Sequence, residues 1–280
     1  MNRLSLDDVV DNLDDLPSLP AVVMELLNSI DAEEVDIAVL ARKVALDGAL
    51  TAKTLRLANS ALYGLQVRIT TIQQAITYLG FQTARNLITA AALTGCFPES
   101  RCSGFSHPAF WRHSLATAIC AKELARHVRF NQDYAFTAGL LHDVGRLVLA
   151  SCFPDHYAQV IAWRGARDAL WLDAERAVLG IDHVDAGLAL AEHWNFSDPM
   201  RLAIGCHHAP EMPGAGLLAA ITHVADAMVH ALDLAGVADD TVPPLSAVAW
   251  HALGLDEKAC LRVFRDTETE FADMAQVLLP

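Results

Sequence analysis

No stretch of this sequence is both long enough and apolar enough to cross a lipid bilayer. The most apolar segment, residues 217–235, is interrupted by two histidines and two aspartates, namely His223, Asp226, His230 and Asp233. The first eight residues also lack the apolar core of a secretion signal. The sequence therefore predicts a cytoplasmic protein without membrane insertion.

Positive charge is also in short supply. Lysine and arginine together number 20 against 34 aspartates and glutamates, which gives a formal net charge of -14. A field of this sign repels nucleic-acid phosphates and anionic lipids unless a local basic patch overrides it. We therefore expect no direct binding of DNA or RNA.

The spacing of the cysteines argues against two further classes of protein. The six cysteines form no CxxC pair and no zinc-ribbon pattern, so neither a disulfide framework nor a thiolate metal site is indicated. We expect buried, reduced thiols instead.

Helix-forming residues dominate what the sequence does contain. Hydrophobic residues make up 53% of the 280 residues, which excludes a disordered chain. Alanine and leucine prevail, while runs of β-branched residues are short. No repeat period, low-complexity tract or coiled-coil heptad is visible. The sequence predicts an all-α fold, a multi-helix bundle.

The segment from residue 96 to residue 108 divides the predicted helices into two groups. It contains two prolines, one glycine and three serines. We place a boundary near residue 105, between an N-terminal helical lobe (1–105) and a second lobe with the C-terminal helices (106–280). In the first lobe we expect helix caps at Asp36, Asp47 and Thr71. In the second lobe the predicted helices cover residues 109–128, 134–150, 155–165, 172–179, 183–194, 199–208, 217–234 and 257–278.

A histidine and an aspartate stand side by side in an apolar helical stretch, Leu140-Leu141-His142-Asp143-Val144. Burying an aspartate is costly unless a cation, an ion-pair partner or several donors meet its charge. A divalent metal that also binds His142 would meet this requirement. The sequence holds further ligands of suitable type, which are His113, His183, His207, His208 and Asp226. A metal-free pair held by hydrogen bonds stays open as the alternative.

The mixture of imidazole and carboxylate ligands bears on the identity of such a metal. These ligands together suit iron, manganese, zinc or nickel better than calcium or magnesium. We favour iron or manganese, in a site of one or two ions. Two ions roughly 3.5–4 Å apart can stabilise both the attacking and the leaving oxygen of a phosphoester. The expected chemistry is phosphoester hydrolysis.

The order of the candidate ligands resembles the motif of HD-domain phosphohydrolases. A histidine, a His-Asp pair and a later aspartate follow the defining order, and the histidines between the pair and the last aspartate are similar to second-metal ligands of the HD-GYP branch. The resemblance implies one metal held by His113, His142, Asp143 and Asp226, and a second held by His183, His207 and His208. It also implies that Asp143 bridges the two metals.

The N-terminal lobe resembles a narrower family, the HDOD domain. The strings that look like its signature are Leu16-Pro17-Ser18-Leu19-Pro20, Asp47-Gly48-Ala49-Leu50-Thr51, Leu55-Arg56-Leu57-Ala58-Asn59-Ser60-Ala61 and Ala75-Ile76-Thr77-Tyr78-Leu79-Gly80. The resemblance covers about residues 16–230. It implies an HD-like fold and a bacterial regulatory module, in a family whose metal motifs are often eroded. The motif of this chain is less eroded than most.

Three departures from the HD-GYP pattern bear on the function. Ala109 stands four residues before His113, where an HD-GYP protein can place a glutamate ligand. No Gly-Tyr-Pro follows His208, and Arg146 stands where a lysine is usual, which keeps the charge but changes the donor geometry. We therefore do not expect hydrolysis of cyclic di-GMP.

Two functions follow as predictions. The first is a signal-transduction module that acts through signalling-protein partners and carries a divalent metal site, with a phosphate-containing small molecule as a further ligand. The alternative is a metal-dependent phosphohydrolase that acts on a nucleotide or cyclic nucleotide, with Asp143 and Arg146 as catalytic residues. For six other histidines we expect surface or satisfied core positions, namely His107, His127, His156, His193, His230 and His251. His223 is ambiguous because it lies on the same predicted helix as Asp226. We expect Asp182 and Asp185 to be helix caps.

Overall fold

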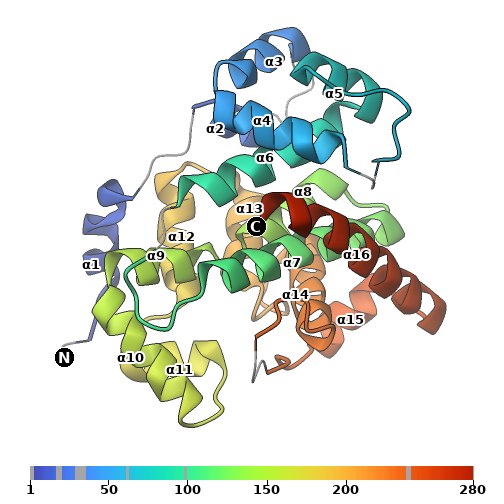
Figure 1. Cartoon of the computed structure of the whole chain (residues 1–280). Helices are drawn as coiled ribbons and strands as arrows, with labels where there is room; N and C mark the ends of the chain where they lie inside the picture. Colours follow the sequence, from blue (N-terminus) through green and yellow to red (C-terminus); the bar gives the residue numbers. More distant parts are fainter. Residues whose placement is uncertain are drawn as a thin grey trace.

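The computed structural model describes residues 3–16, 21–28, 36–60, 63–97, 100–237 and 241–279. Within these ranges every regular element is a helix and no strand occurs, which confirms the all-α prediction (Figure 1). Residues 17–20 of the first HDOD-like string, and Ala61 of the third, lie outside the described residues.

The first helices form a layer above the rest of the molecule. The layer consists of α2 (Ala21–Asn28), α3 (Ile37–Ala45), α4 (Gly48–Ala58), α5 (Ile72–Leu79) and α6 (Phe81–Cys96). Two short helices precede it, α1 (Leu6–Asp11) and the 3-10 helix η1 (Leu13–Asp15). In Figure 1, α2 to α5 lie above α6, which contacts α2, α4 and α5. Asp36, Asp47 and Thr71 each accept a backbone hydrogen bond at the start of a helix, so the three predicted caps are confirmed.

Helix α1 is separate from this layer and packs against α9 and α12. The predicted boundary near residue 105 lies in the connection between α6 and α7. One continuous hydrophobic core nevertheless extends from Val9 in α1 to Leu278 in α16 and includes α6. The division into lobes 1–105 and 106–280 stays a prediction.

The remaining helices follow α6 in the chain and begin with a long helix, α7. They are α7 (His107–Val128), α8 (Gln132–Leu141), α9 (Val144–Cys152), α10 (Pro154–Gly165), α11 (Trp171–Val178), α12 (His183–His193), α13 (Asp198–Cys206), α14 (Gly216–Ala231), α15 (Ala247–Leu253) and α16 (Glu257–Leu278). Helix α7 packs against α8, α14 and α16. The single helix expected over residues 134–150 was wrong, because the chain turns at His142 and Asp143 and divides it into α8 and α9.

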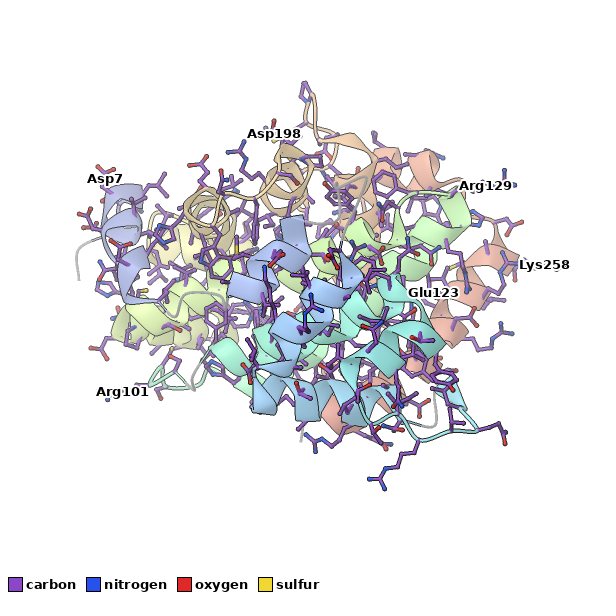
Figure 2. The ribbon with its side chains drawn as sticks, turned by 90° about the horizontal axis from the view of Figure 1, so that it is seen from above. Asp7, Arg101, Glu123, Arg129, Asp198 and Lys258 are labelled. Carbon is purple, nitrogen blue, oxygen red and sulfur yellow. The ribbon has the colours of Figure 1, made fainter. Side chains whose placement is uncertain are left out.

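Charged side chains are sorted between the surface and a few buried pairs. Asp7, Arg129 and Lys258 lie exposed at the outer edge of the molecule when it is viewed from above (Figure 2). By contrast, Asp133 at the start of α8 is buried, forms an ion pair with Arg85 of α6 and accepts a hydrogen bond from Asn86 at 3.0 Å. This pairing satisfies the buried charge and joins the N-terminal layer to α8.

Two glycines on either side of His142 and Asp143 allow neighbouring helices to touch backbone to backbone. A Cβ atom on Gly139 of α8 would lie 2.7 Å from the Cα of Ala118 in α7. A Cβ atom on Gly145 of α9 would lie 1.9 Å from the carbonyl oxygen of His183 in α12. Glycine therefore brings two neighbouring helices, α7 and α12, close to the turn between α8 and α9.

Across the described residues, no single helix combines the length and hydropathy that a membrane span requires. One sharply bent helix pair, residues 132–152 with residues 154–165, reaches those limits by length and composition alone.

Candidate metal centre

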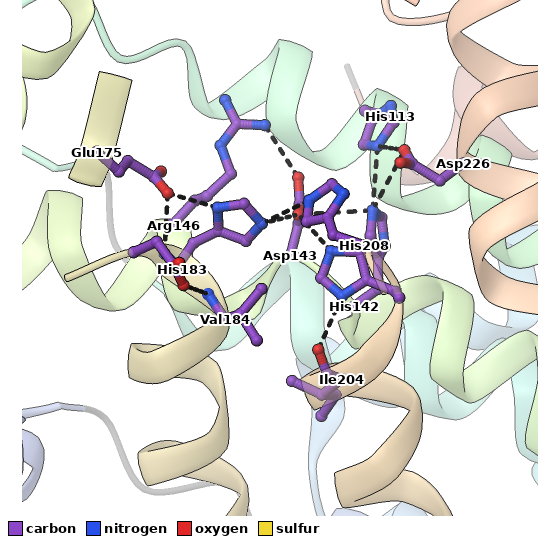
Figure 3. A network of polar contacts seen from close by, with 12 residues as sticks. His113, His142, Asp143, Arg146, Glu175, His183, Val184, Ile204, His208 and Asp226 are labelled. Atoms are coloured by element: carbon purple, nitrogen blue, oxygen red, sulfur yellow. Dashed lines mark hydrogen bonds and ion pairs between the residues drawn. The ribbon is translucent and has the colours of Figure 1, made fainter. Parts of the chain in front are cut away.

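The fold brings all seven predicted ligands into one cluster (Figure 3). All are buried except His208, which is half-buried. His113 lies on α7, and His142 and Asp143 form the turn between α8 and α9. His183 is the first residue of α12, His207 and His208 directly follow α13, and Asp226 lies on α14. Five separate segments of the chain therefore meet at a single polar site inside an apolar bundle.

One half of the cluster contains His113, His142 and Asp226. The Nε2 atom of His113 lies 3.0 Å from Oδ1 of Asp226 and 3.2 Å from Nε2 of His142. The Nε2 atom of His142 lies 3.6 Å from the same Asp226 oxygen. We call this half the first position.

The other half contains the remaining three histidines. The Nε2 atoms of His183 and His208 are 3.0 Å apart. Oδ1 of Asp143 lies 3.3 Å from Nε2 of His183 and 3.6 Å from Nε2 of His207. We call this half the second position. The same Asp143 oxygen lies 3.7 Å from Nε2 of His142, so it stands between the two positions.

The orientation of the rings fits a bound cation. The Nδ1 atoms of His142 and His207 each lie 2.8 Å from a backbone carbonyl oxygen, which can only accept a hydrogen bond, so each Nδ1 carries a hydrogen and donates it. A neutral ring held in this way presents the lone pair of Nε2 to the cluster, toward Asp143. Among the described residues, Nε2 of His207 has no hydrogen-bond partner. Converging lone pairs repel one another unless a cation lies between them.

The spacing of the donor atoms also fits a metal. Donors that share one ion through bonds of about 2.1 Å stand roughly 3.0–3.4 Å apart. The separations in the cluster, 3.0 to 3.7 Å, lie close to this range. The residues therefore fit a divalent metal, and their imidazole and carboxylate groups suit a transition metal better than calcium or magnesium.

Nearby positive groups keep the carboxylates of Asp143 and Asp226 charged. Burial alone raises the pKa of Asp143, but His142, His183, His207 and Arg146 outweigh it and hold that pKa well below its usual range. The pKa of Asp226 is lowered in the same way, with burial opposed first by His230.

The histidines divide into two groups by the same effects. Burial lowers the pKa of His113, His207 and His208, which favours the neutral rings that bind metal. For His183, burial also acts to lower the pKa, but the carboxylates of Glu175 and Asp143 raise it to about 9. The carboxylates of Asp143 and Asp226 likewise outweigh burial and raise the pKa of His142.

A model of the HDOD domain family matches residues 16–210 of the chain. The chain belongs to the HDOD family. Its fold is shared by an HDOD domain protein from Geobacter sulfurreducens, with 24% identity, a TM-score of 0.85 and 98% of both chains covered. A proposed phosphohydrolase from Shewanella amazonensis has 28% identity and a TM-score of 0.76, with 97% of this chain and 98% of that one covered.

One curated relative is an uncharacterised protein from Treponema pallidum. It is 26% identical over 209 residues, which make up 72% of this chain and 40% of the relative. This HDOD chain spans less than half of the length of the curated relatives that it matches. The activities of those longer proteins are therefore not transferred to it.

A buried carboxylate that the sequence analysis missed holds His183 in place. Glu175 of α11 accepts hydrogen bonds from Nδ1 of His183 at 2.5 Å and from the His183 backbone N–H at 2.9 Å (Figure 3). It also accepts one from the Tyr157 hydroxyl at 2.8 Å. Arg146 donates to the Tyr157 hydroxyl at 3.3 Å and to Oδ2 of Asp143 at 3.0 Å. Glu175 thereby fixes the ring of His183, and Arg146 fixes the carboxylate of Asp143.

Replacing Glu175 by glutamine should weaken metal binding at the second position alone. The amide keeps the size of the side chain but removes the charge that makes the His183 ring a stronger donor. Loss of such a partner lowers metal affinity by roughly 10- to 100-fold. Competition with a chromophoric chelator measures the change, and Glu192→Gln, on the exposed face of α12, is the matched control. Equal affinities in the two variants would contradict the role given to Glu175.

Three other predicted positions have clear outcomes. Asp182 and Asp185 form a capping box at the start of α12, so the prediction of helix caps is confirmed. His223 is a positioning residue, because its Nδ1 atom lies 2.7 Å from the carbonyl oxygen of His207 and its Nε2 atom accepts from the backbone of Ser246 at 2.8 Å. Neither ring nitrogen of His223 is therefore left for a metal.

His230, which is outside the predicted ligand set, places a ring nitrogen at the cluster. Its Nε2 atom is 3.3 Å from Oδ1 of Asp226, and its side chain is 11% exposed. The spacing of four residues between Asp226 and His230 on α14 was a usable signal, because such residues share one helix face.

A cavity of about 180 Å³ reaches the cluster from outside. Residues of both positions line it, namely Asp143, His183, His208 and Asp226. Arg164 and Trp171 also line it. The guanidinium groups of Arg146 and Arg164 lie 4.0 and 4.5 Å from the centre of the Trp171 ring. The cavity thus offers a path to the centre, with cationic groups beside it.

Proposed function

We propose that this HDOD chain is a signal-transduction module built around a two-position divalent metal centre, which binds a phosphate-containing ligand, and that its output passes through signalling-protein partners. The observation that carries the proposal is the convergence of the Nε2 lone pairs of His142 and His207 on Asp143. The family assignment supports the signalling role, because HDOD modules are typically regulatory.

Each part of the centre has a separate task in this proposal. His113, His142 and Asp226 would hold one ion, His183, His207 and His208 would hold the other, and Asp143 would serve both positions. A bound divalent ion attracts and polarises a phosphoryl oxygen. Arg146 keeps the Asp143 carboxylate oriented through its hydrogen bond to Oδ2. An anionic ligand would enter through the cavity beside Arg164 and Trp171.

A second candidate function is phosphoester hydrolysis at the same centre. The open cavity favours it, because a substrate could reach Asp143 and His183 directly. The Shewanella amazonensis protein at 28% identity, described as a proposed phosphohydrolase, supports the same chemistry. In this candidate Asp143 and the nearby Arg146 would act on a nucleotide or cyclic nucleotide, Arg146 through its charge.

Elemental analysis of the freshly purified chain tests the metal centre. We expect about two transition-metal ions per chain, lost with a strong chelator and regained with iron or manganese. A chain that takes up neither metal would overturn the proposal. Assays of the loaded protein with nucleotides and phosphodiesters then separate the two functions, since an inert, fully loaded protein would exclude hydrolysis and leave the signalling module.

A further inference from the structure

We propose that His230 is an additional metal ligand at the first position, an inference that rests on the proposed metal centre. His230 follows Asp226 by one helical turn on α14, so the two side chains point the same way. Its Nε2 atom lies 3.3 Å from Oδ1 of Asp226, and its ring centre lies 4.5 Å from that of His113. Donor atoms of His113, Asp226 and His230 all lie within 4.8 Å of one another.

The surroundings of His230 leave room for this role. Ala109, one turn before His113 on α7, presents only a methyl group to the first position. A cavity of about 90 Å³ is bordered by Ala109, His113 and His230. Since α7 supplies no carboxylate there, His230 supplies the additional donor from α14, on the other side of the cavity.

An imidazole from His230, in place of a carboxylate at position 109, changes the chemistry of the first position. The first position would then hold three imidazoles, from His113, His142 and His230, beside the carboxylates of Asp143 and Asp226. A set richer in nitrogen selects more strongly against magnesium and calcium. It also carries less negative charge, which makes the centre a better binding site for an anionic phosphate ligand.

The competing role for His230 is to support Asp226 by a hydrogen bond without touching a metal. A glutamine at position 230 could preserve that hydrogen bond but offers no imidazole nitrogen. A carboxylate at position 109 could reach the shared cavity and bind the metal, but it would repel Asp226 rather than support it. The two roles therefore predict opposite results for these variants.

The experiment measures metal content and affinity, by elemental analysis and chelator competition, in wild type, His230→Gln, His230→Ala and the double variant His230→Gln/Ala109→Glu. His251→Ala, on the exposed part of α15, is the matched control. We expect both single variants to lose at least about 10-fold in affinity for one ion, the smallest usual effect of losing an outer partner, and to keep the second. We expect the double variant to regain most of that affinity, and the control to match wild type.

Three results would overturn the inference, and they can be told apart. A wild-type chain that binds two ions, together with a His230→Gln variant that binds both with unchanged affinity, removes His230 from the ligand set and leaves the metal centre standing. A wild-type chain that binds no iron or manganese removes both proposals. Weakened binding in His230→Ala that glutamine restores would show the supporting role instead.

Discussion

Replacing Asp143 by asparagine should remove metal from both positions at once. Among the described residues, Asp143 is the one whose single oxygen lies between the two groups of histidines, 3.7 Å from His142, 3.3 Å from His183 and 3.6 Å from His207. Asparagine has the same shape but no charge, so the buried rings lose the anion that they share. We expect each affinity to fall by more than roughly 100-fold, beyond the usual effect of losing an outer partner.

Two further variants make this expectation specific to Asp143. Asp226→Asn should lower affinity at the first position only, and His208→Ala at the second position only, because each contacts a single half of the cluster. Elemental analysis with chelator competition measures all three, and circular dichroism checks that each variant keeps its helices. If Asp143→Asn retains either ion with wild-type affinity, the bridging assignment is wrong.

The helix caps and the candidate ligands could be predicted because each depends on a residue type and its near neighbours in the sequence. The caps at Asp36, Asp47 and Thr71 could be read from the sequence because an N-cap needs only a short polar side chain within one turn of the residues that it caps. The seven candidate ligands could be read because histidine and aspartate in apolar helices are costly and therefore conspicuous.

The turn between α8 and α9 was missed for a physical reason. Adjacent residues on a continuous helix point about 100° apart. His142 and Asp143 reach the same site because the helix stops between Leu141 and Val144, yet the sequence there contains no proline. The break is favoured by tertiary contacts, above all by the approach of Gly145 to α12.

Glu175 and His230 were missed for different reasons. Glu175 lies on a helix of ordinary polarity, and its contact with His183 is made by the folding of α11 against the start of α12. No spacing in the sequence encodes that contact. His230 did carry a spacing signal, but pairs of polar residues four apart are common on helix surfaces, and only burial beside His113 distinguishes this one.

Gly145→Ala should destabilise the fold more than a single methyl group usually does. The added Cβ would lie 1.9 Å from the carbonyl oxygen of His183 and 2.6 Å from the backbone nitrogen of Gly187. Both atoms belong to the backbone of α12, so no side chain can rotate away and the two helices must separate. Overpacking costs about 1–3 kcal/mol and occasionally more, and we expect at least about 3 kcal/mol here.

The same substitution should also weaken metal binding at the second position, because His183 is the first residue of α12 and moves with that helix. Urea unfolding of the metal-free protein measures the loss of stability, and chelator competition measures the weakened second position. Gly165→Ala at the end of α10 is the matched control, since its Cβ would meet no described atom within 4 Å and the change should stabilise by about 0.4–1 kcal/mol. Equal unfolding midpoints for the two variants would contradict the view that contact between α9 and α12 at Gly145 places His183 beside Asp143.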